Sequence, residues 1–241
     1  MSFVKAAICT GARASAPTTP GLEEAGYLTN ETVFSLTELP ARIGVIGAGP
    51  IGCELAQAFA RFGSQVYLIE AMHGIMPNED RDAADIVHQS MVRDGVTLLC
   101  CGKDLTITKT AGGKGLAVNS HGQQYDVAVD EILVGVGRTP NVQGLGLEAI
   151  GVEYDKTGVK VNDRLQTTNP RIYAAGDICS RYKFTHAADA MAQIVIQNAL
   201  FPHPFGLGYA GMDSLIMPWC TFTEPEVAHV GLYEADAKKK G

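Results

Sequence analysis

The sequence has little that would suit a nucleic-acid or membrane partner. Its net charge is −7, and the sequence contains no stripe of basic residues. No apolar run reaches the roughly 18 residues that a membrane-spanning helix needs. The first residues, MSFVKAAICTG, lack the basic region and cleavage site of a secretory signal. We therefore expect a cytoplasmic protein whose partners are small molecules, with no nucleic acid and no membrane.

Cysteines are few, and their spacing suits neither a disulfide framework nor a zinc site, so no metal is expected. No C-x-x-C occurs among the six: Cys9, Cys53, Cys100, Cys101, Cys179 and Cys220. The adjacent pair allows two interpretations, a soft-metal site or two strand residues on opposite faces. The surrounding VTLLCCGKDLTI is typical of a strand and turn, which favours the second.

What the sequence does have is a regular alternation of apolar strands and helices over its first half. The 241 residues, 46% of them hydrophobic, suffice for one large domain or two smaller ones. Helices are predicted over 51–62, 79–93 (with Asn78 as the cap) and 187–200. Strands are predicted over 3–10, 42–46, 65–70, 96–101, 104–109, 115–119 and 131–136. Gly112–Gly113 and His121–Gly122 predict hairpin turns. This order indicates an α/β fold with a parallel sheet.

The segment IGVIGAGPIGCELAQAF carries three glycines, Gly47, Gly49 and Gly52, between a strand and a helix. In a dinucleotide-binding loop, the first permits a tight turn and the second lets the backbone approach a pyrophosphate. The third allows the helix to pack closely on the strand, and the helix N-terminus attracts the phosphates. A glycine turn that merely packs is the alternative, but the strand before and the helix after favour coenzyme binding.

An acidic residue, Glu70, ends the next predicted strand, at the spacing of about 20 residues expected of a ribose-binding carboxylate. A carboxylate there accepts hydrogen bonds from the ribose hydroxyls of NAD and repels the 2′-phosphate of NADP. The following AMHG offers His73 but no arginine to hold that phosphate. The sequence therefore predicts NAD(H) in preference to NADP(H).

Several motifs stand in a familiar order: AICTGAR, GVIGAGPIGCELAQAF, VGVGRTPN, IYAAGDI, FTHAADAMAQIVIQNAL and PWCTFTEPEVAHVGL. Together they resemble the FAD-dependent pyridine nucleotide–disulfide oxidoreductases, above all the mercuric reductase-like branch and its dihydrolipoamide dehydrogenase-like relatives. The resemblance implies a Rossmann-like NAD(P)-binding domain, a parallel sheet plus an antiparallel β-meander, inserted in a partial FAD-binding domain. Its segments would be 1–39 (first FAD segment), 40–141 (NAD(P) domain), 142–210 (second FAD segment) and 211–241 (start of the interface domain).

Binding residues carry over from the resemblance one at a time. Glu54 matches a glutamate beside the nicotinamide, and Pro50 stands where several relatives place a tyrosine gate. The predicted NAD(P) set is Gly47, Gly49, Pro50, Ile51, Gly52, Glu54, Glu70, Gly137 and Arg138. Arg138 alone would more often be a surface charge.

The resemblance also implies a flavin set, Thr10, Gly11, Gly176, Asp177 and His186. Asp177 matches the acid that bonds the ribityl chain of FAD. An apolar strand before it would present its carboxylate at the strand's carboxyl end. His186 matches a stretch near the flavin ring, although a structural histidine fits it equally well.

Three parts of the family's chemistry are missing from these 241 residues: a first FAD-binding glycine loop, a C-x4-C redox pair and a C-terminal His-Glu pair. We therefore expect a portion of an oxidoreductase that passes hydride from NAD(P)H to FAD and on to a disulfide or metal. Alone it should be inactive, with FAD expected in the full-length enzyme, where family members form homodimers. A stand-alone, non-catalytic dinucleotide-binding module is the alternative. An ordinary NAD dehydrogenase is disfavoured, because no proton-transferring residue with a substrate arginine stands out.

Overall fold

The computed structural model describes residues 3–240, and the chain forms two compact units. The sheet unit comprises Ala14–Gly137 and the residues from Cys220 onward; the α4 unit comprises the residues up to Arg13 and Arg138–Trp219. Residues 1–2 and 241, at the ends of the predicted domain segments, lie outside the described part. The four-segment division itself stays a prediction.

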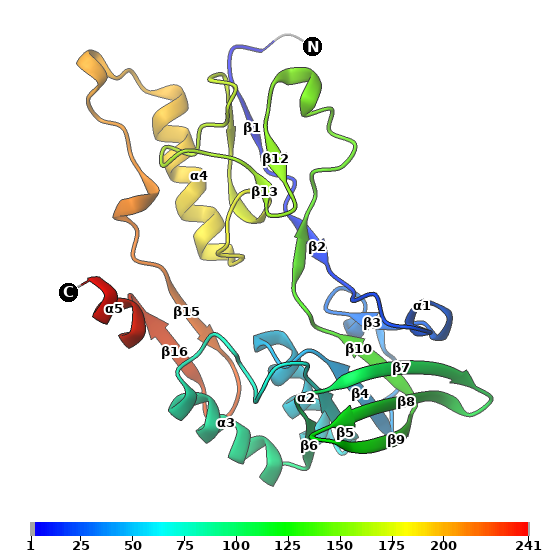
Figure 1. The fold of residues 1–241 in the computed structure, drawn as a ribbon. Helices are drawn as coiled ribbons and strands as arrows, with labels where there is room; N and C mark the ends of the chain where they lie inside the picture. The colour runs from blue at the N-terminus through cyan, green and yellow to red at the C-terminus, as the bar shows by residue number, and fades with distance from the viewer. Residues whose placement is uncertain (1–2, 241) are drawn as a thin grey trace. The chain divides into compact units, whose positions relative to one another are not determined.

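A five-stranded parallel sheet forms the centre of the sheet unit (Figure 1). Its strands, in spatial order, are β3 (Leu28–Thr29), β10 (Glu131–Val134), β4 (Arg42–Ile46), β5 (Gln65–Ile69) and β6 (Val96–Leu99). The crossovers between β4, β5 and β6 are the helices α2 (Pro50–Phe62) and α3 (Arg81–Arg93). All carboxyl ends of parallel strands meet at one edge of the sheet, where ligands of open α/β sheets bind.

Both crossover helices follow from local signals. Proline occupies the first position of α2, and Gly63 ends it with φ 106°. Buried residues of α3 recur at helical spacing, at Ala84, Val87 and Met91. The predicted cap of α3 was wrong, because the helix starts at Arg81 with Asp80 in the capping position rather than Asn78.

An antiparallel three-stranded meander packs against one face of this sheet. Its strands are β7 (Lys103–Thr110), β8 (Gly113–Ser120) and β9 (Gln123–Val129). Leu116 and Val118 of β8 share a buried cluster with Ile46, Ile69 and Ile132 of the parallel strands. The predicted turn at His121–Gly122 joins β8 to β9. Strand β9 was not predicted, because the polar residues Gln123, Gln124 and Asp126 interrupt its apolar positions.

The α4 unit is built from segments far apart in the sequence. Strand β1 (Ala6–Ile8) pairs in parallel with β14 (Ile172–Ala174). Helix α4 (Thr185–Leu200) packs on this pair through Ala187, Met191 and Ile194, which are buried with Tyr173. The predicted helix over 187–200 is confirmed, whereas β1 is shorter than the predicted strand over 3–10.

Shorter elements complete the described chain. They are α1 (Leu22–Ala25), α5 (Glu234–Lys240), β2 (Ala12–Ala14), β11 (Arg138–Pro140), β12 (Tyr154–Asp155), β13 (Gly158–Val159), β15 (Pro218–Thr221) and β16 (Val227–Val230). Five short 3-10 helices lie at Val33–Ser35, Glu148–Ile150, Gly176–Ile178, Pro204–Gly206 and Met212–Ser214.

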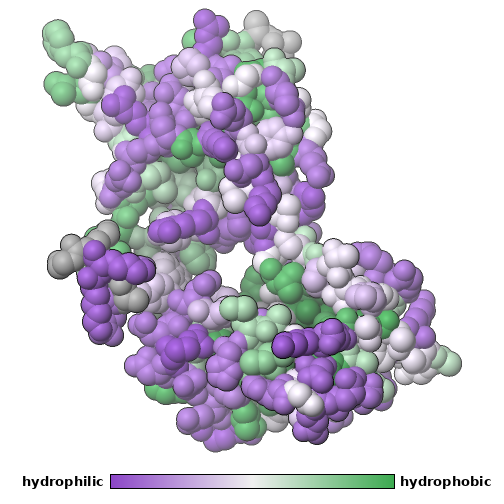
Figure 2. Space-filling view, in the orientation of Figure 1, coloured by the Kyte–Doolittle hydropathy of each residue, from purple (hydrophilic) through white to green (hydrophobic). Residues whose placement is uncertain are grey.

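Hydrophilic residues dominate the face drawn in Figure 2, with smaller apolar areas between them. Among the described residues, no helix combines the length and the apolar character that crossing a membrane requires. The α/β fold class predicted from the sequence is confirmed by the parallel sheet and its antiparallel meander.

Candidate functional site

The glycine loop follows β4 at the carboxyl edge of the sheet and is fixed by backbone hydrogen bonds. Gly47 N donates to Ile69 O at 2.8 Å, which ties the loop to the neighbouring strand. Gly47 has φ 100°, and a Cβ there would lie 2.8 Å from Gly135 O. Only glycine combines that conformation with that proximity without strain. The loop conformation is therefore defined by contacts within the chain.

The other two glycines differ in what surrounds them. A Cβ at Gly52 would lie 1.9 Å from the Gly47 carbonyl oxygen, so this glycine allows α2 to pack against the loop. At Gly49, apart from its immediate chain neighbours, no atom of the described chain would lie within 4 Å of a Cβ. The space beside Gly49 is therefore open, and a glycine there leaves the backbone accessible. Packing requires Gly52, whereas access requires Gly49.

Helix α2 begins directly at this open space. Pro50 is its first residue, Ile51 follows, and no side chain of residues 3–240 caps the helix start. The N–H groups of a first helical turn have no partner within the helix, and the helix dipole places partial positive charge beside them. The arrangement suits an anion such as a phosphate.

Glu70 lies directly after β5 and contacts the loop. Its Oε2 accepts a hydrogen bond from Ala48 N at 2.8 Å, and its Oε1 accepts one from Met72 N at 2.9 Å. A carboxylate has about four lone-pair positions, so two remain for further donors. The predicted strand end and glycine loop are thus brought together, with the carboxylate held in a fixed orientation and half-buried.

The segment after Glu70 is anchored by residues that no sequence motif singled out. Met76 N donates to Ala48 O at 2.7 Å, which makes a second tie to the glycine loop. The Arg81 guanidinium, at the start of α3, donates to the carbonyl oxygens of Ile75, Met76 and Glu79. Arg81 therefore positions the backbone beside the candidate site.

Glu54 and Gly137 complete the sheet unit's share of the predicted set. Glu54 Oε1 accepts a hydrogen bond from Phe222 N at 2.8 Å, and the Gly137 carbonyl accepts one from Ser15 N at 3.0 Å. Glu54 is thus tied to the chain's later segment. Beside it, burial raises the pKa of the Cys53 thiol to about 12, which makes that thiol unreactive at neutral pH.

The predicted flavin residues Thr10 and Gly11 gather around Asn141 in the α4 unit. Thr10 Oγ1 donates to Asn141 O at 3.1 Å, and Asn141 Nδ2 donates back to Thr10 O at 2.9 Å. Asn141 N also donates to Gly11 O at 2.9 Å. Asn141 closes the VGVGRTPN motif but was not itself singled out from the sequence.

Arg138, which was predicted with the coenzyme residues, forms an ion pair with Asp177 of the predicted flavin set. Its Nε is 3.2 Å from Asp177 Oδ2, and its Nη2 donates to Ala12 O at 2.8 Å. The Nε contact lacks hydrogen-bond geometry, so this buried N–H has no hydrogen-bond partner in the described chain. A buried donor without a partner is costly, which makes this position receptive to an added acceptor.

Asp177 itself follows β14 within the 3-10 helix Gly176–Ile178, as the strand-end argument predicts. Gly176 is buried, and its N–H points at the sulfur of Met191, 3.3 Å away. Lys183 Nζ donates to the Asp177 carbonyl at 3.2 Å. Burial lowers the pKa of Lys183, an effect that nearby Asp177 opposes.

His186 takes part in an aromatic stack near the start of α4. Its ring lies 5.3 Å from that of Phe184 at an interplanar angle of 9°, and Phe184 in turn stacks on Trp219. Its Nε2 lies 2.7 Å from Pro218 O. These contacts account for a structural role, and the flavin-tuning role stays a prediction.

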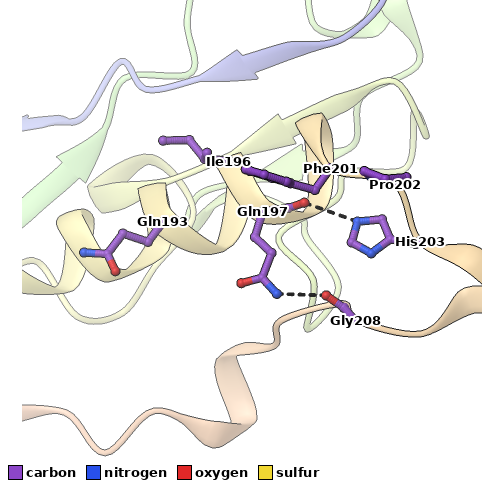
Figure 3. A pocket seen from close by; sticks show the side chains of 7 residues that line it. All are labelled: Gln193, Ile196, Gln197, Phe201, Pro202, His203 and Gly208. Atoms are coloured by element: carbon purple, nitrogen blue, oxygen red, sulfur yellow. Dashed lines mark hydrogen bonds between the residues drawn. The ribbon is translucent and has the colours of Figure 1, made fainter.

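A pocket of about 410 Å³ lies at the far end of α4, lined by Gln193, Ile196, Gln197, Phe201, Pro202, His203 and Gly208 (Figure 3). Gln197 contacts two other lining residues: its side chain donates to Gly208 O, and its backbone carbonyl oxygen lies 3.2 Å from His203 Nε2. None of the predicted site residues lines this pocket. It is therefore separate from the candidate sites described above.

The interpretation of Cys100 and Cys101 as strand residues on opposite faces was wrong. Strand β6 ends at Leu99, and Cys101 has φ 54°, outside the extended region. Because the backbone turns there, the two sulfur atoms do not point to opposite faces of a sheet. Both lie within 4.8 Å of ring nitrogens of His73 and His121.

A family model, curated sequences and solved structures all match this chain over most of its length. The family model described as pyridine nucleotide-disulphide oxidoreductase matches residues 1–192. The mercuric reductase of Staphylococcus aureus is 36% identical over 235 residues, 97% of this chain and 42% of the reductase. The dihydrolipoyl dehydrogenase of Bacillus subtilis (strain 168) is 34% identical over 215 residues, 88% of this chain and 44% of the dehydrogenase.

Among solved structures, the HOCl-induced flavoprotein disulfide reductase RclA from Escherichia coli matches with a TM-score of 0.86 and 32% identity. The match covers 98% of this chain and 53% of RclA. The chain thus spans less than half the length of the two curated relatives above.

Proposed function

This chain belongs to the pyridine nucleotide-disulphide oxidoreductase family, and from that premise we propose that it is the NAD(P)H-binding portion of a flavin-dependent oxidoreductase. Proteins of this family depend on FAD and NAD(P) and are enzymes in their full-length form. The complete reaction would pass hydride from NAD(P)H to FAD and on to a disulfide or a metal, as the mercuric reductase-like resemblance implies.

One observation carries this proposal: an open, uncapped helix start and an oriented carboxylate lie side by side. The space beside Gly49 accepts a pyrophosphate, which the first-turn N–H groups of α2 would bind. Glu70, held by Ala48 N and Met72 N, would accept the adenosine ribose hydroxyls through its remaining lone pairs.

The same carboxylate supports NAD(H) over NADP(H). A 2′-phosphate would bring a second negative charge beside Glu70, and like charges repel strongly at contact distance. The following residues 71–74, Ala-Met-His-Gly, include no arginine that could form the paired hydrogen bonds a phosphate favours. We expect Glu70 to discriminate by at least tenfold, the equivalent of about 1.4 kcal/mol.

A flavin site in the α4 unit is proposed from the chemistry of its residues. Asp177 offers a half-buried carboxylate to hydroxyl donors, and Arg138 Nε is a buried donor without a hydrogen-bond partner in residues 3–240. These two groups, with Gly176 beside them, would hold FAD, which supplies hydride acceptance and transfer when bound. Thr10 and Gly11, through Asn141, would fix the neighbouring backbone.

Turnover by these 241 residues is not expected. The sequence contains no cysteine pair spaced C-x4-C, and burial raises the pKa of both Cys53 and Cys179 to about 12. Without a C-x4-C pair, electrons reaching a flavin would lack the redox disulfide that the family resemblance implies. Homodimer formation and a cytoplasmic location stay predictions for the full-length protein.

The test is a titration of the purified chain with NADH and with NADPH, followed by nicotinamide fluorescence or calorimetry. We expect NADH to bind at least tenfold more tightly. Glu70→Ala should weaken NADH binding by about 1.5–3 kcal/mol, the range for hydrogen bonds to a charged group, and narrow the NADH/NADPH ratio. Glu153→Gln, in the other unit, is the matched control. Tighter binding of NADPH by the unaltered chain would refute the role of Glu70.

A further inference from the structure

Four side chains outside the proposed coenzyme site converge at one corner of the sheet unit. They are His73, Cys100, Cys101 and His121, here named the Cys–His cluster. Each offers one metal-ligating atom, and the four atoms all lie within 4.8 Å of one another. Two thiols and two imidazoles are the donor set of many structural zinc sites.

Two of the separations between these atoms are close to those around a tetrahedral ion, and the others are at most 4.8 Å. Cys100 Sγ lies 3.2 Å from His121 Nε2, and Cys101 Sγ lies 3.5 Å from His73 Nδ1. Zinc bond lengths and a tetrahedral angle place bound sulfur and nitrogen ligands about 3.4–3.8 Å apart. Only small side-chain movements would therefore bring all four atoms to bonding distance of one ion.

Hydrogen bonds between three separate segments bring the four residues of the cluster together. Cys101 N donates to Met72 O at 2.9 Å, which joins the end of β6 to the segment carrying His73. Ser120 Oγ donates to Cys100 O at 2.6 Å, which joins the same end to the β8–β9 turn carrying His121. The convergence is thus maintained by hydrogen bonds that do not involve the four ligand atoms themselves.

The backbone at two of the four residues is unusual. Cys101 has φ 54° and His121, in the β8–β9 turn, has φ 52°, in the left-handed region that residues other than glycine, asparagine, aspartate and histidine rarely adopt. Each such residue costs on the order of 1 kcal/mol or more, so strain of this kind tends to accompany a function. Here it turns both side chains toward the same point.

The four residues of the Cys–His cluster differ in solvent exposure. Cys100 is buried and Cys101 is half-buried, while both histidines are exposed. Their rings meet edge to face, with centroids 6.0 Å apart at 89°. An ion could therefore enter from solvent between the imidazoles and be held from beneath by the sulfur atoms.

We propose that the Cys–His cluster binds one zinc-type divalent cation in tetrahedral coordination by His73, Cys100, Cys101 and His121. Mixed thiolate and imidazole ligands favour zinc over magnesium or calcium, which take oxygen ligands. The ion would link the segment after β5, the end of β6 and the β8–β9 turn. The site stands on its own residues and does not depend on the proposed coenzyme specificity.

The experiment titrates the reduced, metal-free 241-residue chain with Co²⁺ and then displaces it with Zn²⁺. Tetrahedral Co²⁺ with sulfur ligands gives strong visible absorption, which reports coordination without any activity assay. The test variants are Cys100→Ser with Cys101→Ser, and His121→Asn, because asparagine tolerates the left-handed backbone. Cys9→Ser and His88→Ala, outside the cluster, are the matched controls. Circular dichroism of each variant checks the fold.

We expect one Co²⁺ per chain, displaced by one Zn²⁺, with the spectrum lost in the double cysteine variant. Removing a residue that only orients a metal ligand lowers metal affinity by ~10- to 100-fold. His121→Asn removes a ligand itself, so it should weaken Co²⁺ binding by at least that factor. The controls should bind as the unaltered chain does. Absence of stoichiometric binding, or binding by the folded double variant that equals the unaltered chain's, would overturn the proposal.

Discussion

The two units of this protein present their proposed ligand-binding residues in different ways. In the sheet unit, β4, α2, β5, α3 and β6 follow one another along the chain and meet at one sheet edge. In the α4 unit, β1 pairs with β14 from a distant part of the sequence, and one helix covers the pair. A binding site assembled from consecutive elements can be predicted locally, whereas one assembled from distant segments cannot.

The chemistry of the two sites differs in the same sense. The sheet unit offers backbone N–H groups and one carboxylate that backbone donors already orient. The α4 unit offers an ion pair, Arg138 with Asp177, in which one buried donor lacks a partner. The groups of the first proposed site are oriented by hydrogen bonds within the chain, while the second contains a buried donor to which an acceptor would add a hydrogen bond.

The largest expected effect tests whether the units are energetically separate. Leu68, fully buried in the sheet unit, and Met191, fully buried in the α4 unit, are equivalent core positions. Each change to alanine should lower the free energy of unfolding of the unit that contains it by about 2–5 kcal/mol. Hydrogen exchange should then rise in β4–β6 for Leu68→Ala and in β14 and α4 for Met191→Ala. Equal effects across both units in both variants would contradict the separation.

A smaller effect separates packing from access within the glycine loop. Gly52→Ala forces a Cβ against the Gly47 carbonyl and should lower stability by about 1–3 kcal/mol through overpacking. Gly49→Ala meets no atom of the described chain, so thermal unfolding should hardly change while NADH binding weakens. Calorimetric unfolding and NADH titration of both variants measure the two effects. Equal loss of stability in both would show that Gly49 serves packing.

The smallest effect concerns an ion pair that ties β4 to the start of β10. Arg42 Nη2 donates to Asp130 Oδ1 at 2.5 Å, and this hydrogen bond lowers the pKa of Asp130 below its ordinary value. A lowered folded-state pKa contributes stability above the unfolded value of 3.8 that is lost as pH falls through the folded value. Because both groups are about one-third exposed, Asp130→Asn should cost only about 0.2–1 kcal/mol at pH 7.

Urea unfolding of the Asp130→Asn variant at pH 7 and pH 3 checks this sign. The difference from the unaltered chain should be present at pH 7 and smaller at pH 3, which lies below the unfolded value of 3.8, because the unfolded chain's carboxylate is then protonated. A difference that grows toward acid pH would contradict the assigned cause of the pKa shift.

Local patterns predicted much of the sheet unit. The strand over 42–46, the helix after the glycines and the His121–Gly122 turn were found as predicted, because apolar periodicity and turn residues act over short distances. Strand β9 escaped because its residues are largely polar on one face, and the cap of α3 escaped because Asn78 and Asp80 are both good caps.

Contacts between distant segments could not be predicted in this way. The Ala48–Glu70 hydrogen bond was implicit in the loop motif, but the anchors Arg81 and Asn141 carry no local signal. Cys100 and Cys101 were read as an ordinary strand, because nothing in VTLLCCGKDLTI reveals that two histidines from other segments lie beside them. Placing such residues requires the tertiary structure.

The most direct test of the central claim is a crystal of this chain soaked with NADH. We predict density for the pyrophosphate at the start of α2 beside Gly49, with the adenosine ribose hydroxyls on Glu70. Coenzyme density bound elsewhere, or none at saturating concentration, would contradict the account.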